Sequence, residues 1–166
     1  MISIALDNSC LNLRKKQEVL NKLDQLYVKN KILLNCSRVN EIEQLKTQKN
    51  KDYLNKYISI ITEKKNLIES GRLGISKFGD FLFSKKNLNY NLRKIFSKNS
   101  DLIDSDYFDI WLLETAILNK QDFFVTLNTN HFIKDGKKES IESLGIKIRE
   151  PNKDFLKELN GLINNP

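Results

Sequence analysis

The run FFV at residues 123–125 constrains the fold of this chain more than any other segment. Aromatic and β-branched side chains in an unbroken run between polar residues are typical of a strand buried on both faces. Strands of this kind occur in parallel sheets, because helices cover both faces of the sheet. The strand ends at Thr126, where a polar run over residues 126–131 begins. Ligands of open parallel sheets bind beyond the carboxyl ends of the strands, so we expect an α/β protein with its functional site here.

The segment before this strand has the pattern of a helix. Apolar residues recur at helical spacing between positions 108 and 117, and Ser105 and Asp106 supply an N-cap and a first-turn acid. This helix places Asp109 near its start. Asp106 is more typical of a helix-start acid than of a ligand, although it lies one turn from Asp109.

The N-terminal third also predicts the α/β class. Residues 2–6 predict a strand that delivers Asp7 at its carboxyl end, residues 15–28 an amphipathic helix, and residues 32–34 a second strand. A β-α-β unit of this kind has parallel strands and a right-handed crossover.

The remaining sequence predicts more helices and one more strand. Asn35 and Ser37 offer N-caps for a helix after the second strand. Between residues 74 and 100 the pattern is the least clear in the chain. The other expected elements are an amphipathic helix over residues 52–68, a short helix over 140–144, a strand over 146–148 and a terminal helix over 154–162.

Length, charge and cysteine content limit the class of protein. The 166 residues fit a single domain over residues 1–166, and the net charge of +7 favours an anionic partner, with nucleic acid ahead of a membrane surface. No apolar run approaches the roughly 20 residues of a membrane span. Residues 1–10 lack the pattern of a signal peptide, so we expect a cytoplasmic protein. Cys10 and Cys36 form no CxxC pair and are expected to be reduced core residues.

Three carboxylates fall at comparable places in this pattern: Asp7 after the first strand, Glu41 in the helix after the second, and Asp109. In a parallel sheet these positions converge on one crevice. Carboxylates gathered together repel one another, which raises pKa values or recruits a hard divalent cation such as Mg²⁺ or Mn²⁺. A metal held there lowers the pKa of a bound water and orients it for attack on a phosphodiester.

Five fragments in this order resemble the PIN-domain family, metal-dependent ribonucleases that include many toxins of toxin-antitoxin pairs. The fragments are ALDNS, LLNCSRVNEIEQL, DIWLLETA, FFVTLNTNHF and GIKIREPNKDFL. The resemblance runs over most of the chain and implies a three-layer α/β/α sandwich with a central parallel sheet of four or five strands. It implies that Asp7, Glu41 and Asp109 are the catalytic, metal-binding acids, with Glu41 favoured over Glu43 by counting from the strand end. Ser9 and Thr126 then become supporting polar or phosphate contacts.

The chain departs from the family pattern where the fourth acid is usual. Asn128 and Asn130 stand there, and an Asn binds metal only through a neutral carbonyl oxygen. We expect Asn128 to be a neutral fourth ligand or to hold a water, and Asn130 to contact substrate. The single histidine, His131, is expected to be a surface loop residue beside a buried Phe132, because the proposed metal chemistry needs no imidazole.

The function expected from this resemblance is a Mg²⁺- or Mn²⁺-dependent endoribonuclease, of the kind found as the toxin of a toxin-antitoxin pair. RNA is the expected partner, and an antitoxin protein and a second copy of the chain are further candidates. One alternative is a PIN-like module that has lost catalysis and binds RNA or protein. A metal-dependent DNA nuclease of related fold is another, because nothing in the sequence identifies a 2′-hydroxyl contact.

Overall fold

The computed structural model describes residues 1–13, 17–37, 39–40, 65–67, 87–97 and 102–164. Its described strands form one parallel sheet in the order β3-β2-β1-β4-β5. The strands are β1 Ile2–Leu6, β2 Ile32–Ser37, β3 Lys65–Leu67, β4 Phe123–Val125 and β5 Lys147–Arg149. The described helices are α1 Asn8–Leu13, α2 Glu18–Val28, α5 Leu88–Phe96, α6 Asp104–Leu118, α7 Thr129–Phe132, α8 Lys137–Glu142 and α9 Lys153–Asn164.

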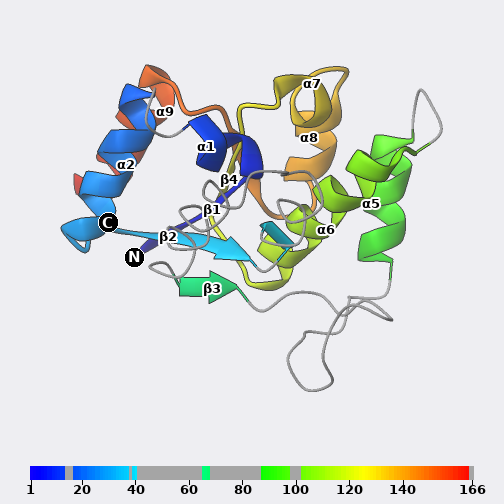
Figure 1. The fold of residues 1–166 in the computed structure, drawn as a ribbon, viewed down its shortest axis with the longest axis horizontal. Helices are drawn as coiled ribbons and strands as arrows, with labels where there is room; N and C mark the ends of the chain where they lie inside the picture. The colour runs from blue at the N-terminus through cyan, green and yellow to red at the C-terminus, as the bar shows by residue number, and fades with distance from the viewer. Residues whose placement is uncertain (14–16, 38, 41–64, 68–86, 98–101, 165–166) are drawn as a thin grey trace, which may run out of the picture.

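Helices cover both faces of the sheet, which confirms the predicted three-layer α/β/α arrangement. Figure 1 shows α2 and α9 on one side of the strands and α5, α6 and α8 on the other. Alternate residues of β4 separate the two cores: Phe123 and Val125 pack with α1, α2 and α9, whereas Phe124 packs with α5, α6 and α8. Each of these three side chains is at most 1% exposed, as predicted for a strand buried on both faces.

The register of the sheet brings two strand ends to one edge. Leu6 of β1 pairs with Val125 of β4, so the residues that follow these strands, Asp7 and Thr126, emerge side by side. The backbone N–H of Asp7 donates to the carbonyl of Val125 at 2.9 Å, which continues the ladder by one residue. This edge therefore holds Asp7 and Thr126, two of the polar residues that the sequence singled out.

Two local predictions after β2 are wrong. Asn35 is not an N-cap: it lies inside β2 and is 2% exposed, and its amide donates to the buried Gln121 at 2.6 Å. Residues 65–67, expected in a long helix, form the edge strand β3, in which Lys65 pairs with Asn35. A helical side-chain pattern is a weak preference, and pairing with the open edge of β2 overrides it. The other residues of the helix predicted over 52–68 lie outside the described residues.

Other boundaries differ by a few residues. The helix expected from Ser105 begins at Asp104, and the Asp106 carboxylate accepts the backbone N–H of Ile103 at 2.9 Å. The short helix near residue 140 begins earlier, after Gly136, whose φ of 72° is a left-handed conformation that suits glycine. Helix α5 was not foreseen, and both cysteines are buried and form no disulfide, as expected. Within the described ranges, no helix is both long and apolar enough to cross a membrane.

Candidate metal centre

Asp7 is the first of the two parts of the candidate site. It is the residue directly after β1, and its carboxylate is 3% exposed. One oxygen accepts the backbone N–H of Asn8 at 2.7 Å, and the other accepts the hydroxyls of Thr126, at 2.7 Å, and of Ser9. Burial raises the pKa of the Asp7 carboxyl above its ordinary value of 3.8, and these hydrogen bonds oppose the rise. A buried carboxylate with a raised pKa gains stability from a nearby cation, so Asp7 is a suitable metal ligand.

Ser9 and Thr126 hold this carboxylate in place. Each hydroxyl donates to Asp7 and also accepts a backbone N–H, from Leu127 at 3.0 Å for Ser9 and from Asn128 at 2.9 Å for Thr126. Because each hydroxyl gives its proton to Asp7 and is itself fixed by a backbone N–H, the two hydroxyls orient the Asp7 carboxylate. Their contact with a phosphate remains a prediction.

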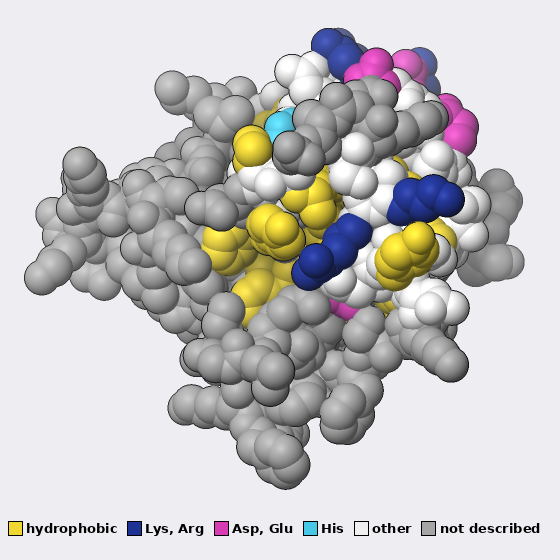
Figure 2. All heavy atoms as spheres, turned by 90° about the vertical axis from the view of Figure 1, so that its right-hand side faces the viewer, with side chains coloured by type: hydrophobic (Ala, Val, Ile, Leu, Met, Phe, Trp, Pro, Cys, Tyr) yellow, Lys and Arg dark blue, Asp and Glu magenta, His cyan; other side chains and the backbone are white. Residues whose placement is uncertain are grey.

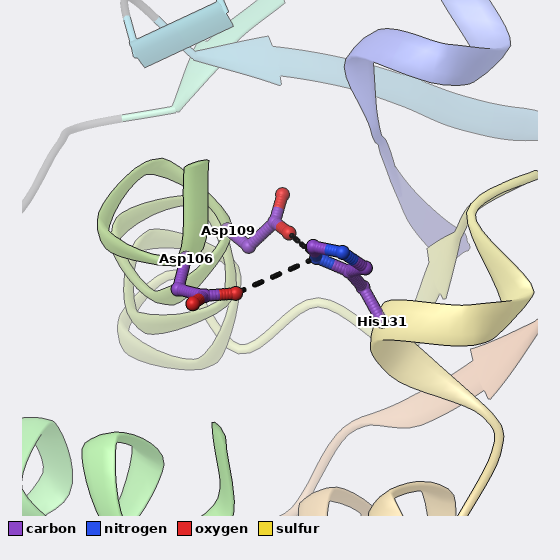
Figure 3. Close-up of side chains that lie close together, drawn as sticks. All are labelled: Asp106, Asp109 and His131. Atoms are coloured by element: carbon purple, nitrogen blue, oxygen red, sulfur yellow. Dashed lines mark hydrogen bonds and ion pairs between the residues drawn. The ribbon is translucent and has the colours of Figure 1, made fainter. Parts of the chain in front are cut away.

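Asp106, Asp109 and His131 form the second half of the site. Asp106 and Asp109 lie one turn apart on α6, and their side chains point toward His131, which comes from α7 (Figure 3). The Nδ1 atom of His131 is 2.8 Å from Oδ2 of Asp109 and 3.6 Å from Oδ1 of Asp106. The potential ligand atoms of the three residues all lie within 4.8 Å of one another. The Asp109 side chain is 9% exposed, whereas the His131 side chain is 32% exposed, so the group is open to solvent on the histidine side.

A continuous path of hydrogen bonds joins the two halves. Thr126 donates to Asp7 and accepts the backbone N–H of Asn128, and the carbonyl of Asn128 accepts the backbone N–H of His131 at 3.2 Å. His131 in turn contacts Asp109. The polar run after β4 therefore connects the buried carboxylate of Asp7, just after β1, with the carboxylates on α6.

The sequence-predicted residues differ in how far the structure describes them. Asn128 is partly buried at the start of α7, and Asn130 is exposed. Glu41 lies outside the described residues, but the residue before it, Asn40, is 1% exposed. The Asn40 amide donates to the Leu6 carbonyl at 3.2 Å and to the Asn8 side chain at 3.0 Å, beside Asp7.

Sequence reasoning underrated two members of the group. His131 was expected to be a surface loop residue, yet it is partly buried on α7 and pairs with Asp109. Asp106 was expected to be a helix-start acid, and it does bond the backbone of Ile103, but its other oxygen faces His131. The signals present in the sequence were the spacing of one helical turn between the two acids and the place of the histidine in the polar run after a buried strand.

The donor set suits a divalent cation. Carboxylate oxygens and a neutral imidazole nitrogen are common ligands of Mn²⁺ and Zn²⁺ in proteins, and carboxylates alone suit Mg²⁺. Asp106 and Asp109 offer two negatively charged groups from one rigid helix, and His131 offers a nitrogen from a second element. The residues present therefore fit the kind of metal that the family resemblance implies.

Comparison with known proteins identifies the fold. No family model and no curated protein matches the chain. A chain of VapBC2 from Rickettsia felis, bound to a DNA fragment from its promoter, is similar with a TM-score of 0.54 and 12% identity, over 90% of this chain and 98% of that one. A chain of DNA-bound VapBC from Salmonella typhimurium is similar with a TM-score of 0.53 and 13% identity, over 92% and 100% of the two chains.

The toxins of such complexes are PIN-domain proteins. This chain therefore has a PIN-domain fold, and the fold that the sequence resemblance implied is confirmed.

Proposed function

We propose that the chain is a metal-dependent endoribonuclease of the type that acts as the toxin of a toxin-antitoxin pair. The observation that supports this most is the cluster of Asp106, Asp109 and His131 at the carboxyl edge of the sheet, within 4.8 Å. Hydrogen bonds within residues 126–131 link this cluster to the buried Asp7, which supports a site that includes acids from the end of β1 and from α6. Parallel α/β sheets place their active sites at this edge.

The proposed roles follow from position and chemistry. Asp7, Glu41 and Asp109 are the metal ligands, with Asn128 as a neutral fourth ligand, and Ser9 and Thr126 fix the orientation of Asp7. Asn130 is the proposed substrate contact, and its exposure next to His131 supports this role. A bound Mg²⁺ or Mn²⁺ supplies an activated water and stabilises charge on the leaving oxygen of a phosphodiester.

RNA is the proposed substrate because the net charge of +7 favours a polyanion and the fold matches toxins of this class. An antitoxin protein and a second copy of the chain are proposed partners, since the similar structures are VapBC complexes. The cytoplasmic location and the single domain over residues 1–166 stay predictions.

The test is cleavage of structured and single-stranded RNAs, with a DNA of matched sequence, by purified protein in Mn²⁺, in Mg²⁺ and in chelator. Asp7→Ala and Asp109→Asn should each lower the rate by about 100-fold or more, the scale for losing one group that stabilises transition-state charge. Asp135→Asn is the matched control, because Asp135 is exposed and its left-handed φ of 60° is one that Asn tolerates. Equal activity in chelator, or in the Asp109 variant, would contradict the proposal.

One observation favours a second candidate, an inactive PIN-like module that binds RNA or protein. Asn128 and Asn130 stand where the family usually carries an acid, which removes negative charge from the site. Such a module would bind RNA equally well in chelator, and its affinity would fall steeply with salt because phosphate contacts release counterions. Measuring the binding of the same RNAs, with and without chelator, in addition to their cleavage distinguishes the two candidates.

A further inference from the structure

We infer that His131 is a direct metal ligand and that its imidazole makes the site select Mn²⁺ over Mg²⁺. This inference rests on the proposed metal-dependent function and adds to it a ligand that the carboxylate set does not contain. It begins from the position of the histidine: Nδ1 lies 2.8 Å from an oxygen of Asp109 and 3.6 Å from an oxygen of Asp106.

These distances are those of neighbouring donors around one cation. Ligand atoms about 2.1 Å from a metal are about 3.0 Å apart at a right angle and about 3.4 Å apart at the tetrahedral angle. The separations from Nδ1 to the two carboxylate oxygens, 2.8 and 3.6 Å, lie just below and just above this range. A cation can therefore bind between Nδ1 of His131 and Oδ2 of Asp109, in place of the hydrogen bond that joins them, after only small side-chain shifts.

The donors are also held in advance by the packing around them. Asp106 and Asp109 share one face of α6, because residues three apart lie one above the other on a helix. His131 precedes Phe132, which is fully buried, and the Phe132 ring packs 5.2 Å from that of Phe124 and 5.7 Å from that of Phe96. This anchor fixes α7 against the sheet and keeps the imidazole beside α6.

The site is accessible to an ion from solvent. The His131 side chain is 32% exposed, and Figure 2 shows the chain's single histidine, in cyan, at the surface of the molecule. The Asp109 carboxylate beneath it is only 9% exposed. A metal can therefore enter from the histidine side and be held by carboxylates that water reaches poorly.

The nitrogen donor determines which metal the site prefers. Mg²⁺ takes oxygen ligands almost exclusively and releases its waters reluctantly, whereas imidazole is a good ligand for the first-row transition metals. A neutral amide at Asn128 and an imidazole at His131 also bring no negative charge, which weakens binding of the harder ion most. We therefore expect Mn²⁺ to bind more tightly than Mg²⁺ by a wider margin than in an all-carboxylate site.

The experiment measures metal binding without RNA. Mn²⁺ and Mg²⁺ affinities are determined by calorimetry for the wild-type protein, for His131→Ala, for His131→Asp and for the control Asp135→Asn. His131→Ala should weaken Mn²⁺ binding by at least about tenfold, since loss of a mere supporting partner of a metal ligand already costs about 10- to 100-fold. His131→Asp should recover affinity for Mg²⁺ and so lower the preference for Mn²⁺. The control should change neither.

A spectroscopic readout separates ligation from a structural role. Pulsed electron paramagnetic resonance of bound Mn²⁺ should show coupling to a ¹⁴N nucleus in the wild-type protein and in Asp135→Asn, and no such coupling in His131→Asp. Absence of nitrogen coupling in the wild type, or an unchanged preference for Mn²⁺ in both His131 variants, would overturn the inference. Nitrogen-ligated Mn²⁺ in a protein that cuts no RNA would leave the inference standing and refute the nuclease. Metal-dependent cleavage without nitrogen coupling would support the nuclease and overturn the inference about His131.

Discussion

Asn40 offers the sharpest test of how the site is held together. Its side chain connects the ends of the neighbouring strands β1 and β2: Oδ1 accepts the backbone N–H of Ser37 at 2.8 Å, and Nδ2 donates to the carbonyl of Leu6 at 3.2 Å. The same Nδ2 also donates to the side chain of Asn8, next to Asp7. We predict that Asn40→Ala destabilises the fold and weakens metal binding together, because it frees the strand ends that carry the site.

The expected size of the effect follows from the groups that lose their partner. The Ser37 N–H and the Leu6 carbonyl lie in a region where Asn40 is 1% exposed, and a buried polar group left unsatisfied costs roughly 1 to 3 kcal/mol. Two such groups, partly relieved by water in the space left by the amide, give a loss of about 3 kcal/mol. For a chain of this size, that corresponds to a fall in Tm of about 6 to 12 °C.

The assay is urea denaturation followed by circular dichroism, with Mn²⁺ affinity measured in parallel. Asn91→Ala is the matched control: this residue is exposed on α5, and its substitution should change the free energy of unfolding by no more than about 0.5 kcal/mol. A loss below about 1 kcal/mol for Asn40→Ala would show that its hydrogen bonds do not hold the strand ends. Full Mn²⁺ affinity in a strongly destabilised variant would show that the hydrogen bonds of Asn40 stabilise the fold without supporting the metal site.

Three further predictions concern residues around the sheet. Thr126→Val removes a hydrogen bond that lowers the pKa of Asp7, so that pKa should rise and the acid limb of the pH profile for metal binding should move to higher pH. Phe132→Ala should lower the free energy of unfolding, measured by urea denaturation, by about 3 to 5 kcal/mol, because it leaves a cavity where a fully buried ring was packed. A loss below about 1 kcal/mol would contradict this packing. Arg149→Met should lower the free energy of unfolding by about 1 kcal/mol at pH 7, because the ion pair of Arg149 with Glu158 is partly exposed and solvent screens it. Arg149 lowers the pKa of Glu158 below its ordinary value of 4.5, so this difference is present above pH 4.5 and should shrink as the pH falls through the lowered pKa; a difference constant with pH would refute it.

The features that the sequence predicted correctly depend on local pattern. The buried strand at residues 123–125 and the helix that carries Asp109 follow from the order of apolar and polar side chains alone. The place of Asp7 after β1 follows from the length of the first apolar run. Together with the parallel topology, these elements were sufficient to predict the class of fold and the edge of the sheet where Asp7 and Thr126 meet.

The features that were missed depend on contacts between distant segments. Lys65 is in a strand because β2 has an open edge, and Asn35 is buried because Gln121, 86 residues away, meets its amide. The pairing of His131 with Asp109 arises because a short helix returns toward α6, and no periodicity in the sequence encodes that return. A histidine in a polar run offers too little local information to distinguish a ligand from a surface residue.

The path of hydrogen bonds between Thr126 and His131 has a thermodynamic consequence. A metal that draws His131 toward α6 also acts on the backbone of Asn128, and through it on the hydroxyl that bonds Asp7. Occupancy of the cluster on α6 and protonation of the Asp7 carboxylate are then linked equilibria, each shifting the midpoint of the other by the same free energy. Metal concentration would therefore act on the protonation state of Asp7 in two ways, through direct contact with the metal and through this path of hydrogen bonds.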